Sequence, residues 1–287
     1  MSFDIFITVG PSDFEIIKYT LNLNLKNINN YKNIYIHSEF KNFNFDKVNN
    51  INQSFFPFSR NEITDLIKNK SRAGWIYQQL VGLYYPFIQN NSENVLVIDS
   101  DVFFTKKIDF QSGSKNIFTV GYEYHKPYFD HMKLLHPDLV KHDQFSGISH
   151  HMIYNKTILK DLIKKVEDFH SEEFYKVFIK NLNKYEISGA ADYEIYYNFA
   201  LKNYKDMHLT RELVWTNLEK FSINNFFKYD FVSLPHYEKT RPGDFLINLK
   251  EFKLIRALYC LKNFLYLKLV IRKIKLIKEN EINSFES

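Results

Sequence analysis

Cysteine is almost absent from this 287-residue sequence, since Cys260 is the only one. A single thiol cannot form a disulfide within the chain, which excludes a disulfide-stapled scaffold and favours a reducing compartment. No uninterrupted apolar run reaches the roughly 18–20 residues that a membrane span needs. Residues 1–4 also carry no basic cluster of the kind that opens a secretory signal. These absences predict a cytoplasmic protein.

Glycine-based signals are missing as well. The chain has 8 glycines, and none forms the G-x-G-x-x-G turn of a dinucleotide-binding site. There is no internal repeat and no Gly/Ser-rich linker, while hydrophobic residues make up 45% of the chain. We therefore predict one large domain over residues 1–245 and a distinct segment over residues 246–287.

The N-terminal part alternates strand and helix patterns. Phe3–Val9 and Asn33–His37 have the composition of strands, and apolar residues at helical spacing run from Phe14 to Ile28 between them. Ser12 and Glu15 have the spacing of a capping box at the start of that helix. Such a β-turn-α-β opening predicts a right-handed parallel sheet.

Two aspartates end the most apolar stretch of the sequence. Val95–Ile98 is typical of a strand buried on both faces, and Asp99, Ser100 and Asp101 follow it. Side chains two apart in an extended chain point the same way, so the two carboxylates can converge. Paired carboxylates at the carboxyl end of a parallel strand suit Mn²⁺ or Mg²⁺ that also holds phosphate oxygens. Ser100 would then face a ribose.

The segment Leu246–Lys278 differs from the rest in charge. Glu251 is its only acid, and its basic residues are Lys250, Lys253, Arg256, Lys262, Lys268, Arg272, Lys273, Lys275 and Lys278. Apolar residues between them predict one or two basic amphipathic helices. Such a helix either docks on an anionic membrane surface or packs with a solvated basic face. Nucleic acid is not expected, because its binding would also need basic residues spread over the folded domain.

Six short motifs follow one another along the chain. They are T-V-G-P (Thr8–Pro11), R-A-G-W-I-Y-Q-Q (Arg72–Gln79), V-I-D-S-D (Val97–Asp101), F-S-G-I-S-H-H-M (Phe145–Met152), A-D-Y-E (Ala191–Glu194) and P-H-Y (Pro235–Tyr237). In this order they resemble nucleotide-sugar-dependent glycosyltransferases of the GT-A fold, more narrowly bacterial and viral polysaccharide-type transferases with an L-x-x-D-x-D strand. The resemblance covers about residues 1–240. It implies a Rossmann-like α/β fold, with a mixed, mainly parallel sheet flanked by helices.

The resemblance also implies an activity and a donor site. The enzyme would be a metal-dependent hexosyltransferase of polysaccharide or glycoconjugate synthesis, with a nucleoside-diphosphate sugar as donor and a glycan or other hydroxyl as acceptor. In such enzymes the turn after the first strand holds the nucleotide, which implies Thr8, Val9 and Gly10. Arg72 matches the basic residue that reaches the donor phosphates, and Gly147 matches the glycine turn along donor and acceptor.

Further roles follow from the same resemblance. His236 matches the late histidine that joins the two aspartates as a metal ligand. Asp192 and Glu194, in a helix predicted over Ser188–Leu201, compete to be the catalytic base of an inverting enzyme. Two residues apart in a helix they cannot share a face, and we favour Asp192, with Glu194 as an outward or structural partner. A retaining enzyme needs no such base, and we favour inversion.

The acceptor side is less specific. His150 and His151 would point in opposite directions, so one of them either contacts a sugar or packs in the core. The aromatic stretch Tyr122–Phe145 is a candidate acceptor wall.

Two other functions fit part of the pattern. A metal-dependent phosphohydrolase or nuclease would use the same carboxylates but normally needs more converging acids or histidines. A non-catalytic sugar-binding protein on the same fold would not need the aspartate pair.

Overall fold

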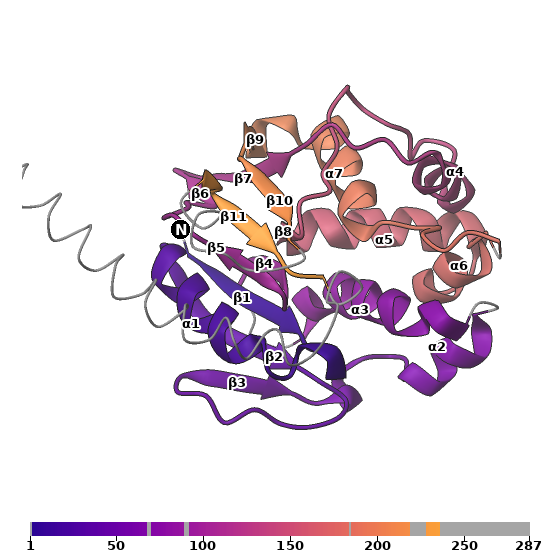
Figure 1. Cartoon of the computed structure of the whole chain (residues 1–287). Coiled ribbons are helices and arrows are strands. Elements are labelled where there is room, and N and C mark those ends of the chain that lie inside the picture. The colour runs from indigo at the N-terminus through magenta and orange to yellow at the C-terminus, as the bar shows by residue number, and fades with distance from the viewer. Residues whose placement is uncertain (1, 68–69, 89–91, 184, 219–227, 236–287) are drawn as a thin grey trace, which may run out of the picture.

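The fold comes from a computed structural model, which describes residues 2–67, 70–88, 92–183, 185–218 and 228–235 (Figure 1). His236, the domain boundary near residue 245 and the basic segment 246–287 lie outside the described residues. Among the helices that are described, none has both the length and the apolar content that crossing a bilayer requires.

A five-stranded sheet forms the centre of the molecule. Its order is β3-β2-β1-β4-β8, with β1 at Phe3–Thr8, β2 at Tyr31–His37, β3 at Val48–Ile51, β4 at Asn94–Asp99 and β8 at His151–Asn155. All neighbours pair in parallel except β8, which runs antiparallel to β4. Strands β1 and β4 are buried at almost every position, as expected for parallel strands covered on both faces. The predicted mixed, mainly parallel sheet is confirmed.

Helices cover both faces of this sheet. They are α1 (Ile17–Asn27), α2 (Arg60–Leu66), α3 (Ala73–Tyr84), α4 (Lys126–Leu135), α5 (Lys156–His170), α6 (Phe174–Lys180) and α7 (Asp192–Asn203). Helix α1 leads outward from β1 to β2, whereas α2 and α3 lead back across β1 to β4. Because both crossovers are right-handed, α1 and α3 lie on opposite faces, and α7 and α5 continue the layer of α3 (Figure 1). The predicted α/β architecture, with helices flanking the sheet, is confirmed.

Two small sheets lie beyond β4. One has the order β10-β11-β5, from Trp215–Asn217, Phe231–Ser233 and Val102–Phe104, and the other has the order β6-β7-β9, from Gln111–Ser112, Lys115–Val120 and His208–Glu212. The chain enters β5 directly after Asp101. The first small sheet therefore fixes the far side of the turn that carries Asp99 and Asp101.

Two buried asparagines of α1 hold β5 from the side. The amide of Asn24 donates to the Val102 carbonyl, and its oxygen accepts the Phe104 N–H, both at 2.9 Å. The amide of Asn27 donates to the Phe104 carbonyl at 2.6 Å. These side chains replace a neighbouring strand for backbone groups that would otherwise be buried without partners.

The first helix begins later than the capping-box spacing predicts. A 3-10 turn, Pro11–Asp13, opens after Gly10, and α1 begins only at Ile17, with no side-chain cap at either start. Proline at the first position favours this early turn, since its fixed φ suits it and no N–H is lost. The prediction that Ser12 caps the helix is wrong.

The helix predicted over Ser188–Leu201 begins at Asp192. The side chain of Gln79 accepts the Asp192 N–H at 3.0 Å and donates to the Ala190 carbonyl at 3.4 Å. In a helix that began one turn earlier, the Asp192 N–H and the Ala190 carbonyl would form hydrogen bonds within the helix instead. Asp192 is therefore the first residue of α7 rather than a residue within it.

We predict that Asn24→Ala lowers the free energy of unfolding by about 2–5 kcal/mol, because Val102 and Phe104 each lose the partner of a buried backbone group. The matched control is Asn22→Ala on the exposed side of α1, whose amide donates to the Lys18 carbonyl, and it should change stability by less than about 0.5 kcal/mol. Chemical denaturation of both variants measures the difference. Equal effects would contradict the role assigned to Asn24.

Candidate active site

Asp99 and Asp101 lie where the strand order of the main sheet reverses. Strand β1 has β2 on one side and β4 on the other, and its last residue, Thr8, pairs in register with Asp99. In open α/β sheets, ligands bind in the crevice outside the carboxyl ends of the strands at such a point. The strand and the turn after it were predicted from sequence, and the structure places both at this crevice.

His150 completes a group of three with the aspartates. One potential ligand atom from each of Asp99, Asp101 and His150 lies within 4.8 Å of the other two. His150 Nδ1 is 3.1 Å from Asp99 Oδ2, and the Asp99 N–H donates to the His150 carbonyl at 3.0 Å. His150 has a φ of 58°, in the left-handed region, where a residue other than glycine costs of order 1–3 kcal/mol. The fold thus holds a strained residue where its imidazole meets two carboxylates.

Neighbouring side chains orient this group. Gln78 Nε2 and the Tyr193 hydroxyl each donate to Asp99 Oδ1 at 3.2 Å. The indole of Trp215 packs edge-on against the His150 ring, with centroids 5.1 Å apart and an interplanar angle of 84°. The three grouped side chains remain partly exposed, so an ion or a substrate can reach them from solvent.

The composition of the group fits a divalent cation. Burial of the His150 ring lowers its pKa. The hydrogen bond and charge of Asp99, together with the charges of Asp101 and Glu123, have a larger effect in the opposite direction, so the net pKa of His150 is raised. Only the neutral imidazole ligates a metal, so cation binding here would release a proton. Carboxylate oxygens suit Mg²⁺ and Mn²⁺, and an imidazole nitrogen is compatible with the same set.

Asp192 lies buried near this group, at the start of α7. It is 7% exposed, and its Oδ2 accepts the Tyr154 hydroxyl at 2.9 Å. Burial raises the pKa of Asp192 to about 7; the Tyr154 hydrogen bond opposes this effect, and the charge of Asp99 adds to it. A carboxyl with this pKa exchanges its proton near neutral pH, which is the property required of a general base.

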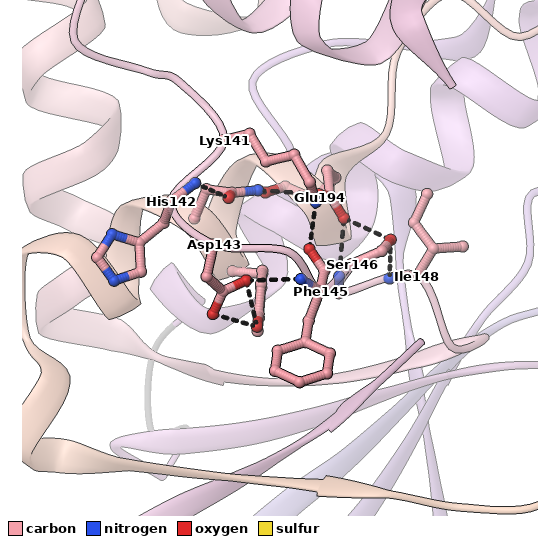
Figure 2. A network of polar contacts seen from close by, with 10 residues as sticks. Lys141, His142, Asp143, Phe145, Ser146, Ile148 and Glu194 are labelled. Carbon is pink, nitrogen blue, oxygen red and sulfur yellow. Dashed lines mark hydrogen bonds and ion pairs between the residues drawn. The ribbon is translucent and has the colours of Figure 1, made fainter. Parts of the chain in front are cut away.

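Glu194 occupies a different environment two residues further on. It is fully buried, and its Oε2 accepts the Ser146 hydroxyl at 2.8 Å and the Gly147 N–H at 2.7 Å (Figure 2). Its Oε1 accepts the Asn198 amide at 3.0 Å and lies 3.8 Å from Lys141 Nζ. Both oxygens are engaged within the protein, so Glu194 holds the 146–147 turn against α7.

Gly147 allows this turn to approach the helix closely. A Cβ at this position would lie 2.5 Å from the Cβ of Tyr197 and 3.1 Å from the Tyr193 carbonyl oxygen. Any side chain would therefore push the turn away from α7. The donor contact predicted for Gly147 stays a prediction.

The residues predicted to hold the nucleotide border the crevice. Thr8 Oγ1 is buried without a hydrogen-bond partner in the described part of the chain. The buried Val9 donates its N–H to the His37 carbonyl at 2.8 Å, and Gly10 leads into the 3-10 turn. Ser100 donates its hydroxyl to Asp13 Oδ2 at 2.8 Å, so a ribose could use it only as an acceptor. An unpartnered buried hydroxyl beside Asp99 is the kind of group that a bound ligand explains.

Arg72 lies at the start of α3, beside a cavity. Its guanidinium stacks on the Trp75 ring, 4.2 Å from the centroid. Both residues line a mostly apolar cavity of about 380 Å³, which is also lined by Ile76 of α3 and by Ile179 of α6. Trp75 is three residues from Gln78 along α3, so the cavity begins about one helical turn from the Asp99 contact. The contact of Arg72 with donor phosphates stays a prediction.

His151 belongs to the core. It is 2% exposed, and its Nε2 lies 2.9 Å from Thr119 Oγ1. Burial keeps the pKa of its imidazole well below the usual range. The rings that pack edge-on around it are Phe104, Phe110 and Phe231. Of the two histidines predicted on the acceptor side, only His150 reaches the crevice.

Sequence reasoning missed three residues of this site. Gln78 and Tyr193 lie inside motifs that were singled out, R-A-G-W-I-Y-Q-Q and A-D-Y-E, but their roles were not identified. A signal existed for Gln78, since a polar residue on a largely buried helix needs a partner. Trp215 gave no signal, because its contact with His150 joins parts of the chain that are far apart in sequence.

Comparisons with known proteins give little further information. No protein-family model matches the sequence, and no curated protein matches it. The structure is similar to the crystal structure of mouse xyloside xylosyltransferase 1 in its apo form, with a TM-score of 0.41 and 9% identity, over 84% of this chain and 100% of that chain.

We predict that Asp192→Asn stabilises the protein above pH 7 and not near pH 4. The carboxyl of Asp192 has a pKa of about 7 when folded, against roughly 3.9 when unfolded. The wild type therefore loses stability as the pH rises from about 4 to about 7, whereas asparagine does not ionise. The advantage of the variant should reach a few kcal/mol at most.

Chemical denaturation at pH 4 and pH 8 measures this effect. The matched control is Asp168→Asn, an exposed acid of α5 that pairs with Lys164, which should show almost the same small change at both pH values. A stability difference for Asp192→Asn that does not vary with pH would contradict a raised pKa.

Proposed function

We propose that this protein is a metal-dependent glycosyltransferase that moves a sugar from a nucleoside-diphosphate sugar to a hydroxyl of a glycan or other acceptor. The group of Asp99, Asp101 and His150 in the crevice at the strand-order reversal carries the proposal. A cation site in this position suits a substrate that brings phosphate oxygens. Asp192, buried nearby with a pKa of about 7, adds a candidate for acid–base chemistry.

On the donor side, Asp99, Asp101 and His150 would hold Mn²⁺ or Mg²⁺. Such a cation, when bound, neutralises charge that develops on a leaving nucleoside diphosphate. Gln78 and Tyr193 hold the Asp99 carboxylate in one orientation, which lowers the reorganisation that binding requires. The Thr8–Gly10 turn borders the same crevice and is proposed to contact the nucleotide, with Arg72 directed to the phosphates.

On the acceptor side, Asp192 is proposed as the general base. In its ionised form the carboxylate accepts the proton of the acceptor hydroxyl as that oxygen attacks the anomeric carbon. This role corresponds to inversion at that carbon. Glu194 is a poor candidate, because both its oxygens already accept hydrogen bonds within the protein.

Two other functions have less support. A two-metal phosphohydrolase or nuclease would need further ligands, and within the described residues Asp99, Asp101 and His150 are the only such group. A sugar-binding protein without catalysis would not need a strained histidine beside two carboxylates. Docking of residues 246–278 on an anionic membrane stays a prediction.

We predict that Asp101→Ala removes the metal dependence of nucleoside diphosphate binding. Isothermal titration of uridine and guanosine diphosphate with Mn²⁺ should show at least a tenfold loss of affinity, to about the level without metal, because losing a ligand weakens the cation site. Asp168→Ala, which changes an acid far along α5, is the control and should bind as the wild type does. An unchanged affinity of Asp101→Ala would remove the metal role.

We predict that Asp192→Asn lowers sugar transfer by roughly 10²–10⁴-fold, the usual scale for a lost general base. Nucleoside diphosphate binding should persist, because Asp192 is not one of the grouped ligands. Wild-type transfer should rise with pH through about 7, as the carboxyl ionises. Near-normal turnover of the variant would assign the base elsewhere or indicate a retaining reaction.

A further inference from the structure

Two exposed tyrosines follow shortly after β7, whose Thr119 Oγ1 lies 2.9 Å from Nε2 of His151, the neighbour of His150. Tyr122 is 67% exposed and Tyr124 is 65% exposed. The residue before them, Gly121, exchanges two backbone hydrogen bonds with Ser146, at 2.9 and 3.0 Å. Ser146 is in turn held by the buried Glu194. The backbone directly before the two tyrosines is therefore hydrogen-bonded to the turn that packs on α7.

Other contacts fix both rings. The Tyr122 ring lies 5.5 Å from that of Phe145, and its hydroxyl donates to Glu212 Oε1 at 2.8 Å. The Tyr124 ring stacks on Phe129 with centroids 5.0 Å apart and an interplanar angle of 20°. Rigid tyrosines supply contact area at a low cost in conformational entropy. These faces are preorganised for a flat ligand.

The residue between the tyrosines connects them to the grouped ligands. Glu123 is exposed, and its charge contributes to the raised pKa of His150. In the other direction, the charge of His150 acts on Glu123. The Glu123 carboxylate therefore lies within electrostatic range of His150, while the tyrosines on either side of it are placed by the pairing of Gly121 with Ser146, four residues before His150.

We propose that Tyr122, Glu123 and Tyr124 form the acceptor platform, and that the acceptor they bind is a pyranose saccharide. A pyranose has an apolar C–H face that packs on aromatic rings and hydroxyls that donate to a carboxylate such as Glu123. A membrane or an apolar helix would need a continuous apolar surface, and the acids Glu123 and Glu212 interrupt this one. The assignment to the acceptor rests on the proposed function, whereas saccharide binding itself does not.

The test compares the wild type with Tyr122→Ala/Tyr124→Ala on a glycan array and by saturation-transfer NMR with pyranose oligosaccharides at millimolar concentration. The double variant should lose at least roughly tenfold in affinity for the glycans that the wild type binds, the scale of two aromatic contacts. The matched control is Phe169→Ala, an aromatic residue of α5 that is 55% exposed and contacts His136 and His170. It should bind glycans as the wild type does.

Glycan binding that is lost in the double variant and kept in the control supports the platform. Binding that is unchanged in the double variant overturns it, as does a wild type that binds no pyranose glycan. Once a donor is known, acceptor KM should rise in the double variant more than kcat falls. Nucleoside diphosphate titration with Mn²⁺ tests the proposed function separately. If the protein binds glycans but shows no metal-dependent binding of nucleoside diphosphate, the transferase assignment is overturned and the saccharide platform is not.

Discussion

The repulsion between Asp99 and Asp101 is the constraint on which the rest of the site depends. Two carboxylate oxygens within 4.8 Å of each other repel by about 1 kcal/mol in water and by about 3–4 kcal/mol at an effective dielectric constant near 20. The surrounding structure supplies hydrogen-bond donors to Asp99 from three separate elements: Gln78 of α3, Tyr193 of α7 and His150 before β8. Because each donor comes from its own element, the sheet and both helices together hold the Asp99 carboxylate in place beside Asp101.

The central sheet was predictable because its signals are local. The apolar runs of Phe3–Val9 and Val95–Ile98 reflect burial on both faces, and a parallel strand shows this in its own sequence. The placement of Asp99 at the carboxyl end of such a strand follows from the same run. The mixed, mainly parallel sheet and the location of the acidic pair could therefore be predicted from the sequence. The capping-box prediction at Ser12 was wrong, because Pro11 favours a 3-10 turn before the helix begins.

The rest of the site depends on contacts that sequence spacing does not encode. His150 meets Asp99, which lies 51 residues earlier in the chain, because β8 pairs antiparallel with β4. Periodicity alone leaves His150 and His151 equivalent, and only the three phenylalanine rings around His151 show which one is in the core. The start of α7 was likewise set by Gln79, which lies 113 residues before Asp192.

The residue at which α7 begins determines which part of the site each of its first side chains contacts. Successive residues of a helix differ by about 100° in direction, and Asp192, Tyr193 and Glu194 accordingly contact Tyr154, Asp99 and the 146–147 turn. Shifting the helix by one residue would exchange these contacts and place a tyrosine where the buried carboxylate belongs. Gln79 prevents the shift by accepting the N–H of Asp192, the first residue, and donating to the carbonyl of Ala190, two residues before it. A glutamine on α3 therefore fixes the position of the proposed base, whereas the residue immediately before it, Gln78, bonds Asp99 instead.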